Sequence, residues 1–100
     1  MKEIRRDLIA DITLYPTNQG GRLVPTATDS FGCPFKIRKD DNLVWDGRLL
    51  LDGTSMKPGE TRRVGVAFLN CEDAAPIFRK AGKFYLWELR IIGEATVISN

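Results

Sequence analysis

Histidine is absent from this chain of 100 residues. Because histidine is the commonest general base near neutral pH and the commonest metal-binding side chain, its absence argues against zinc sites and against Ser–His or Cys–His catalysis. Phosphate-binding loops and dinucleotide motifs are also missing, since the Gly20-Gly21 doublet lacks the lysine or the third glycine that they require. We therefore expect a protein that is not an enzyme and that holds no cofactor and no metal.

Cysteine and long apolar segments are equally scarce. The two cysteines, Cys33 and Cys71, show no CxxC spacing; they are typical of buried thiols in a cytoplasmic protein, and a disulfide is the alternative. No apolar run approaches the ~20 residues that a membrane-spanning helix needs, and residues 1–11 carry too many charges for a signal peptide. We expect a cytoplasmic protein with no membrane association.

A strong charge of one sign is also missing. The net charge is +2, far below that of domains whose charge alone indicates nucleic-acid binding. Basic residues still cluster in three places, within 36–39, 62–63 and 79–83. On alternating strands these side chains either form a solvated face or, if they converge on one side, follow a phosphate backbone. The length and the ordinary apolar content predict one domain, residues 1–100, with one core.

Apolar and polar residues alternate with the period of β-strands along most of the chain. The first strand is the clearest, with Leu8, Ala10, Ile12 and Leu14 on one side. Further strands are predicted around 35–37 and over 43–51, 64–68, 84–89 and 91–98, with a long connection over 23–33 and a short helical turn within 72–83. Six short strands favour an all-β, closed antiparallel barrel, because closure removes exposed strand edges.

Glycine and proline mark the turns of this predicted barrel. The Gly20-Gly21 doublet is expected to turn the chain through positive φ, and Pro58-Gly59 is expected to preset the turn before the fourth strand. Gly93 lies inside the last strand and indicates a bulge or a close approach of two backbones. We expect these residues to serve the fold and not a ligand.

The aromatic side chains have two interpretations. A small barrel needs most of its rings in the core, and the alternative is an outward platform on which RNA bases stack. The residues concerned are Phe35, Trp45, Phe68, Phe84, Tyr85 and Trp87.

The order of several short motifs resembles the C-terminal domain of the translation elongation factor Tu family. These motifs span almost the whole chain and read LIADITLYPT, GGRLVP, PFKIR, VWDGRLLL, MKPGE, RRVGVAFLN and FYLWELRIIGEATV. Each motif is weak alone, and their order and spacing carry the resemblance. It implies a six-stranded, Greek-key-like antiparallel barrel that stands as a single domain, with neither GTP binding nor GTP hydrolysis.

The resemblance also implies an RNA contact. The family's matching arginine and glutamate face tRNA, which assigns that role to Arg22 and Glu88. Several neighbouring positions depart from the family: Trp87 replaces an arginine, Leu89 stands for two glycines, Pro34 replaces a glutamine and Asp46 replaces a threonine. An acid at position 46 would repel phosphate. The alternative for Arg22 is a structural salt bridge across the mouth of the barrel.

Two functions remain open at this point. The first is a non-catalytic module that binds a protein partner through a surface that translation factors use for docking. The alternative is an RNA-binding protein, with tRNA or another RNA held by Arg22, Glu88 and the basic clusters. An exposed apolar patch would favour the first function, and a shared face of basic residues would favour the second.

Overall fold

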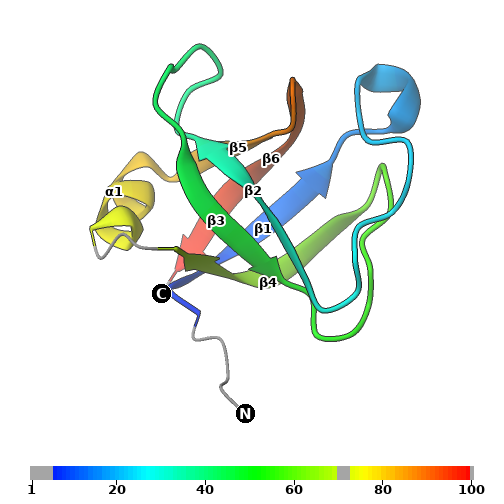
Figure 1. The fold of residues 1–100 in the computed structure, drawn as a ribbon. Coiled ribbons are helices and arrows are strands. Elements are labelled where there is room, and N and C mark those ends of the chain that lie inside the picture. Colours follow the sequence, from blue (N-terminus) through cyan, green and yellow to red (C-terminus); the bar gives the residue numbers. More distant parts are fainter. Residues whose placement is uncertain (1–5, 70–72, 100) are drawn as a thin grey trace.

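Six antiparallel strands close into a barrel in the computed structural model, which describes residues 6–69 and 73–99 (Figure 1). Cys71 lies outside the described residues, as does the start of the predicted helical segment. The predicted fold class, an all-β closed six-stranded antiparallel barrel, is confirmed. The strands are β1 (Leu8–Leu14), β2 (Ser30–Lys36), β3 (Trp45–Leu50), β4 (Thr61–Phe68), β5 (Lys83–Trp87) and β6 (Ile91–Ser99).

The strand order around the barrel is β1-β4-β3-β2-β5-β6, and β6 pairs with β1 to close it. Strands β2, β3 and β4 are neighbours in sequence and in space, and β5 then returns to lie beside β2. This arrangement of four strands is a Greek key. The order also places β4 and β5 on opposite sides of the ring, three strands apart in either direction.

The alternating pattern of β1 produces the predicted burial. Leu8, Ala10, Ile12 and Leu14 point into the barrel and are buried, whereas the intervening side chains are partly exposed. Since β1 pairs with both β4 and β6, its two edges are covered and its apolar face reaches the core. The same core receives side chains from every strand and from the helix.

The strand boundaries differ from the prediction at β2. This strand begins at Ser30 and includes Pro34, whereas the sequence suggested a connection that continues to residue 33. Pairing with β5 is found only at Phe35 and Lys36, so the earlier half of β2 is paired with β3 alone. A proline is tolerated there because one side of the strand makes no ladder bonds.

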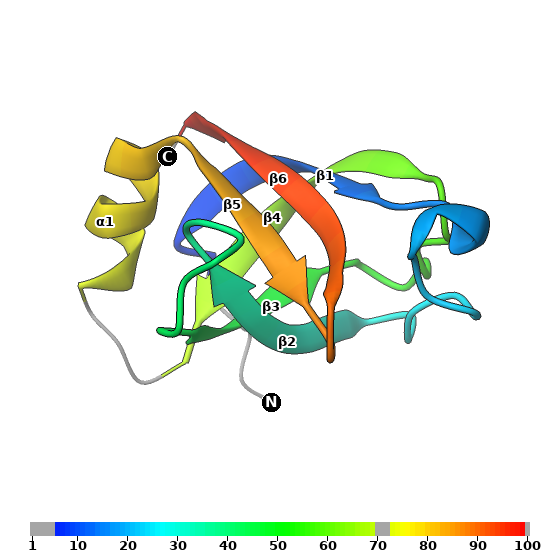
Figure 2. The ribbon, with the colours of Figure 1, turned by 90° about the horizontal axis from the view of Figure 1, so that it is seen from above.

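The helical segment is longer than the single turn predicted. Helix α1 covers Ala74–Ala81, and its buried residues Ala74 and Phe78 are four positions apart on one face. Pro76 lies in the first turn, where backbone N–H groups have no partner within the helix. Figure 2 shows α1 at one end of the barrel and the short 3₁₀ helix η1 (Thr17–Gln19) at the other.

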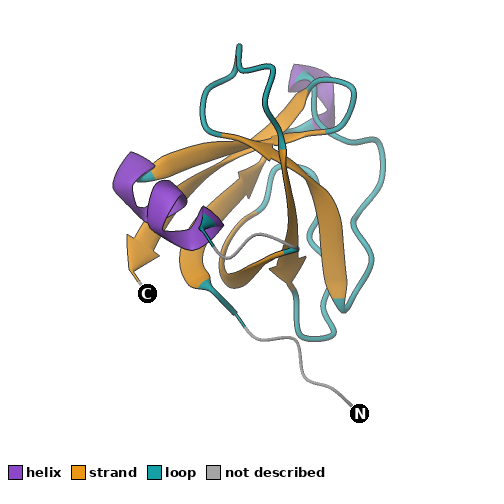
Figure 3. Ribbon diagram, turned by 60° about the vertical axis from the view of Figure 1, so that its left-hand side comes forward, coloured by secondary structure: helices purple, strands orange, loops and turns teal. Residues whose placement is uncertain are grey.

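Helix α1 covers its end of the barrel with an aromatic side chain. Figure 3 shows α1 beside the ends of the strands, and Phe78 enters a cluster of rings that includes Phe35 and Phe84. The core interpretation therefore holds for most of the aromatic residues, and two of the rings lie on the outside of the barrel. Phe35 and Phe84 are buried and Trp45 and Phe68 pack against the core, whereas Tyr85 and Trp87 occupy the outward positions of β5.

The turn residues have two distinct roles. Gly20 has φ 91° and Gly59 has φ 87°, the left-handed region that favours glycine. Gly21 has no positive φ, contrary to the expectation for the doublet: a Cβ there would lie 1.9 Å from the carbonyl oxygen of Tyr15. Gly93 likewise lies at a close approach, since a Cβ there would lie 2.6 Å from the carbonyl oxygen of Thr13.

Pro58 and Gly59 form the turn before β4. The N–H of Glu60 donates to the carbonyl of Lys57 at 3.0 Å, as in a turn with proline second and a positive-φ glycine third. The described residues include no helix with the length and apolar character that a membrane crossing requires.

Candidate functional site

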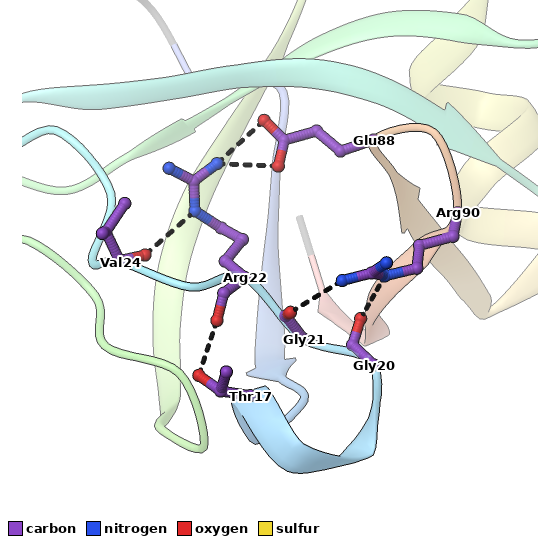
Figure 4. A network of polar contacts seen from close by, with 7 residues as sticks. All are labelled: Thr17, Gly20, Gly21, Arg22, Val24, Glu88 and Arg90. Atoms are coloured by element: carbon purple, nitrogen blue, oxygen red, sulfur yellow. Dashed lines mark hydrogen bonds and ion pairs between the residues drawn. The ribbon is translucent and has the colours of Figure 1, made fainter.

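The loop that follows η1 is fixed to the β5–β6 hairpin by polar contacts (Figure 4). Arg90 donates from Nε to the carbonyl of Gly20 at 2.8 Å and from Nη2 to the carbonyl of Gly21 at 3.3 Å. The Thr17 hydroxyl, at the start of η1, donates to the carbonyl of Arg22 at 2.6 Å. The contacts of Arg90 with the glycine doublet and of Thr17 with Arg22 therefore fix the backbone on both sides of the Arg22 side chain.

Arg22 and Glu88, the two residues assigned to RNA by resemblance, contact each other. Nη1 of Arg22 donates to both carboxylate oxygens of Glu88, at 2.7 and 2.8 Å, and Nε donates to the carbonyl of Val24 at 3.2 Å (Figure 4). The guanidinium also lies 4.7 Å from the centre of the Phe31 ring. The Arg22 side chain is 17% exposed. The structure thus shows the salt bridge that was the alternative for Arg22.

This pairing changes what Arg22 offers to a ligand. A phosphate would have to compete with a carboxylate that already holds the same guanidinium and is itself 39% exposed. The negative charge of Glu88 would also repel the phosphate. The geometry is that of a structural clamp between the loop and the hairpin.

Three apolar side chains project around this clamp. Leu89 is 94% exposed at the hairpin tip, and Leu23 and Val24 are 80% and 57% exposed in the loop. They border an open groove of about 280 Å³ that Arg22, Glu88 and Ile92 also line. We call Leu23, Val24 and Leu89 the apolar rim.

The backbone at the tip of the rim is unusual. Leu89 has φ 63°, a conformation in which a leucine costs about 1–2 kcal/mol relative to the right-handed region. Asp52 also has positive φ, but it precedes Gly53 in an Asp-Gly turn, where aspartate is well tolerated. The sequence prediction missed the rim, although a leucine between two strands, where turns prefer glycine or asparagine, was a usable signal.

The other residues that the sequence singled out for nucleic-acid contact are not part of the Arg22–Glu88 clamp. Pro34 and Asp46 are register partners on β2 and β3. The arginines of β4 are already paired: Arg62 with Glu60 and with loop carbonyls, and Arg63 with Asp11 through two hydrogen bonds. Strand β3 separates β4 from β2, so the basic cluster of 62–63 and Lys36, where the 36–39 cluster begins, lie two strands apart around the barrel.

No known protein family matches the sequence. No curated protein sequence is significantly similar to it either. Within residues 6–69 and 73–99 there is also no group of three or more acidic or thiol side chains placed to hold a metal ion.

Cys33 lies inside the barrel close to the clamp. Burial, and secondarily the negative charge of Glu88, raise the pKa of this thiol to about 12. Only the thiolate reacts with alkylating and disulfide reagents.

We expect Cys33 in a Cys71→Ser variant to be modified at a rate that rises about tenfold per pH unit from pH 8 to about pH 11. An ordinary thiol stops gaining reactivity near pH 9, because its pKa is about 8.5. Stopped-flow or spectrophotometric titration with an aromatic disulfide, on protein kept folded as judged by circular dichroism, measures this profile. A plateau near pH 9 would contradict a buried thiol.

Proposed function

We propose that this protein is a non-catalytic binding module that engages a protein partner through the apolar rim. The observation that supports this most is exposure: Leu89 and Leu23 are the two most exposed large apolar side chains among the described residues, and they border the same groove. Apolar side chains grouped on a surface mark protein interfaces more often than isolated ones do. A charged pair beside them suits the polar surroundings of such an interface.

The clamp prepares the rim for binding. Arg22 and Arg90 together tie the loop of residues 20–24 to the hairpin, so that Leu23, Val24 and Leu89 are presented by ordered backbone. An ordered surface loses less conformational entropy on association than a mobile loop does. The unfavourable φ of Leu89 supports the same view, because backbone strain is concentrated at functional sites.

The kinship proposed for this module is with the C-terminal barrel of elongation factor Tu, in a cytoplasmic setting. That kinship has the sequence motifs as its only support. A lone barrel of this type would act as an adaptor, or as a decoy that presents the factor's docking surface to a protein that targets the factor. Neither role involves GTP.

Leu89→Gly tests the proposal because its effects on folding and on binding have opposite signs. Glycine removes the positive-φ cost of about 1–2 kcal/mol but adds about 0.5–1 kcal/mol of chain entropy, so we expect unfolding to become harder by up to about 1.5 kcal/mol. The loss of an exposed leucine from an interface is expected to reduce partner recovery at least tenfold, since burying such a side chain contributes about 1.5–3 kcal/mol.

The measurement is quantitative affinity capture from the native host with wild-type and variant protein as bait. Leu43→Gly is the matched control, because Leu43 is 64% exposed and lies outside the rim. It should leave recovery unchanged. Equal recovery with wild-type and Leu89→Gly bait, or none with folded wild-type bait, would refute the proposal.

RNA binding through Arg22 and Glu88 remains the alternative, and the geometry favours it less. Using Arg22 for phosphate would require breaking two hydrogen bonds to Glu88 and leaving that carboxylate beside the RNA. Charge-assisted contacts of this kind are among the stronger hydrogen bonds in proteins.

A further inference from the structure

We infer that the outer face of β2 and β5 binds single-stranded nucleic acid, with bases stacked on Tyr85 and Trp87 and phosphates held by Lys36, Lys39 and Lys83. We call these five residues the lysine–aromatic face. The inference goes beyond the protein partner proposed above, because it uses none of the rim residues and neither member of the Arg22–Glu88 clamp.

The strand pattern of β5 places both rings outside. Phe84 and Leu86 point into the core and are buried, so the alternating residues Tyr85 and Trp87 lie on the outer surface, where each is partly exposed. Lys36 of β2 is the register partner of Tyr85. Neighbouring strands therefore bring aromatic rings and a lysine together on one face.

Three ammonium groups lie over these two rings. The Nζ atom of Lys36 is 5.0 Å from the centre of the Trp87 ring, and the Nζ atoms of Lys39 and Lys83 are 5.4 and 5.6 Å from the centre of the Tyr85 ring. Such cation–π contacts are weak at exposed sites. A base that takes the ring face would displace a flexible lysine toward the adjacent phosphate, where its charge is better matched.

The lysines on this face are largely free of ion pairs with the described residues. The side chains of Lys36 and Lys39 form no ion pair with any described residue, and Lys83 has only a 3.9 Å contact with Glu94. Glu94, on neighbouring β6, also accepts a hydrogen bond from the Tyr15 hydroxyl at 3.0 Å. Glu94 is the register partner of Tyr85, and its carboxylate already has these two partners.

The spacing of the rings favours a single strand over a duplex. Residues two apart on a β-strand are about 6.8 Å apart, twice the ~3.4 Å rise of stacked bases in a duplex. Adjacent rings can therefore stack with bases only when those bases are separated from each other. Aromatic side chains beside a row of positive charges are the general arrangement for sequence-tolerant single-strand binding.

Fluorescence anisotropy with labelled 12-nucleotide oligo(U) and oligo(dT) at ~50 mM salt tests the inference. Wild-type protein should bind both probes, because bases and phosphates are common to RNA and DNA. Trp87→Leu should weaken binding about tenfold, as expected from stacking of one base, whereas Trp87→Phe should retain most of it. Lys36→Ala should reduce the dependence of log K on log salt by about 0.7.

Lys57→Ala is the matched charge control, since Lys57 is exposed in the turn before β4, on the other side of the barrel from β5. It should leave the salt dependence unchanged. Circular dichroism confirms that each variant is folded. The inference is overturned by no binding at tens of micromolar protein, by equal affinity for a duplex of the same length, or by equal losses for Lys57→Ala and Lys36→Ala with no effect of Trp87→Leu. Equally tight binding of a poly-glutamate peptide would also overturn it, as simple charge attraction.

Discussion

Gly21→Ala is expected to destabilise the barrel by about 3 kcal/mol or more, while Gly20→Ala, one residue earlier, costs about 1–2 kcal/mol. The two glycines differ in what a methyl group would meet. At Gly20 there is no atom within 4 Å, and the cost comes from φ 91° alone. At Gly21 the added carbon would lie 1.9 Å from the carbonyl oxygen and 2.6 Å from the carbonyl carbon of Tyr15.

The backbone that would have to move at Gly21 is held from several sides. The Tyr15 N–H donates to the carbonyl of Ile92 at 2.9 Å, and the carbonyl of Pro16 accepts from both Gln19 and Gly21. Moving Tyr15 therefore disturbs the contact of β1 with β6 as well as η1. Overpacking with flexible side chains costs about 1–3 kcal/mol, and a collision with fixed backbone lies at or above the top of that range.

Urea unfolding followed by circular dichroism measures both variants, with Gly53→Ala as a second positive-φ control in open space. Gly53→Ala should resemble Gly20→Ala. If Gly21→Ala falls within about 1 kcal/mol of Gly20→Ala, the close approach of loop and strand is not present in solution.

The fold was predictable because its signal is local. In β1 the period-two pattern alone identifies which side chains point inward, and Leu8 to Leu14 follow it without exception. Boundaries were less predictable where pairing decides them. Pro34 argues against a strand on its own, and it is accommodated only because β2 pairs with β5 over two positions.

The site was harder to predict than the fold because it is assembled from distant segments. Arg22 and Glu88 were each identified, but their contact joins residues 66 positions apart and depends on how the β5–β6 hairpin meets the loop. Sequence could not show that this contact occupies the guanidinium. It also could not show that Lys36 and Lys39 lie over the rings of β5, because β2 and β5 become neighbours only when the Greek key forms.

Phe78→Ala is expected to cost about 3–5 kcal/mol of unfolding free energy, the usual range for removing a buried ring. Phe78 is 0% exposed, and its ring centre lies 4.7–6.2 Å from four others. The loss removes the only fully buried aromatic side chain that α1 contributes among the described residues, and with it the ring contacts between the helix and the barrel core. Small domains have about 5–15 kcal/mol in total, so the midpoint temperature should fall by at least ~12 °C.

Ile77→Ala on the same helix is the control, because Ile77 is 41% exposed and its truncation should cost less than about 1 kcal/mol.

A double variant tests whether both ends of the barrel belong to one cooperative unit. Phe78 belongs to α1 and Gly20 caps η1, and these two elements lie at opposite ends of the barrel (Figure 2). In a two-state protein the costs of Phe78→Leu and Gly20→Ala should therefore add to within about 0.5 kcal/mol. A loss of near-ultraviolet signal from the aromatic cluster that precedes the unfolding of the strands would instead show that α1 detaches from a barrel that remains closed.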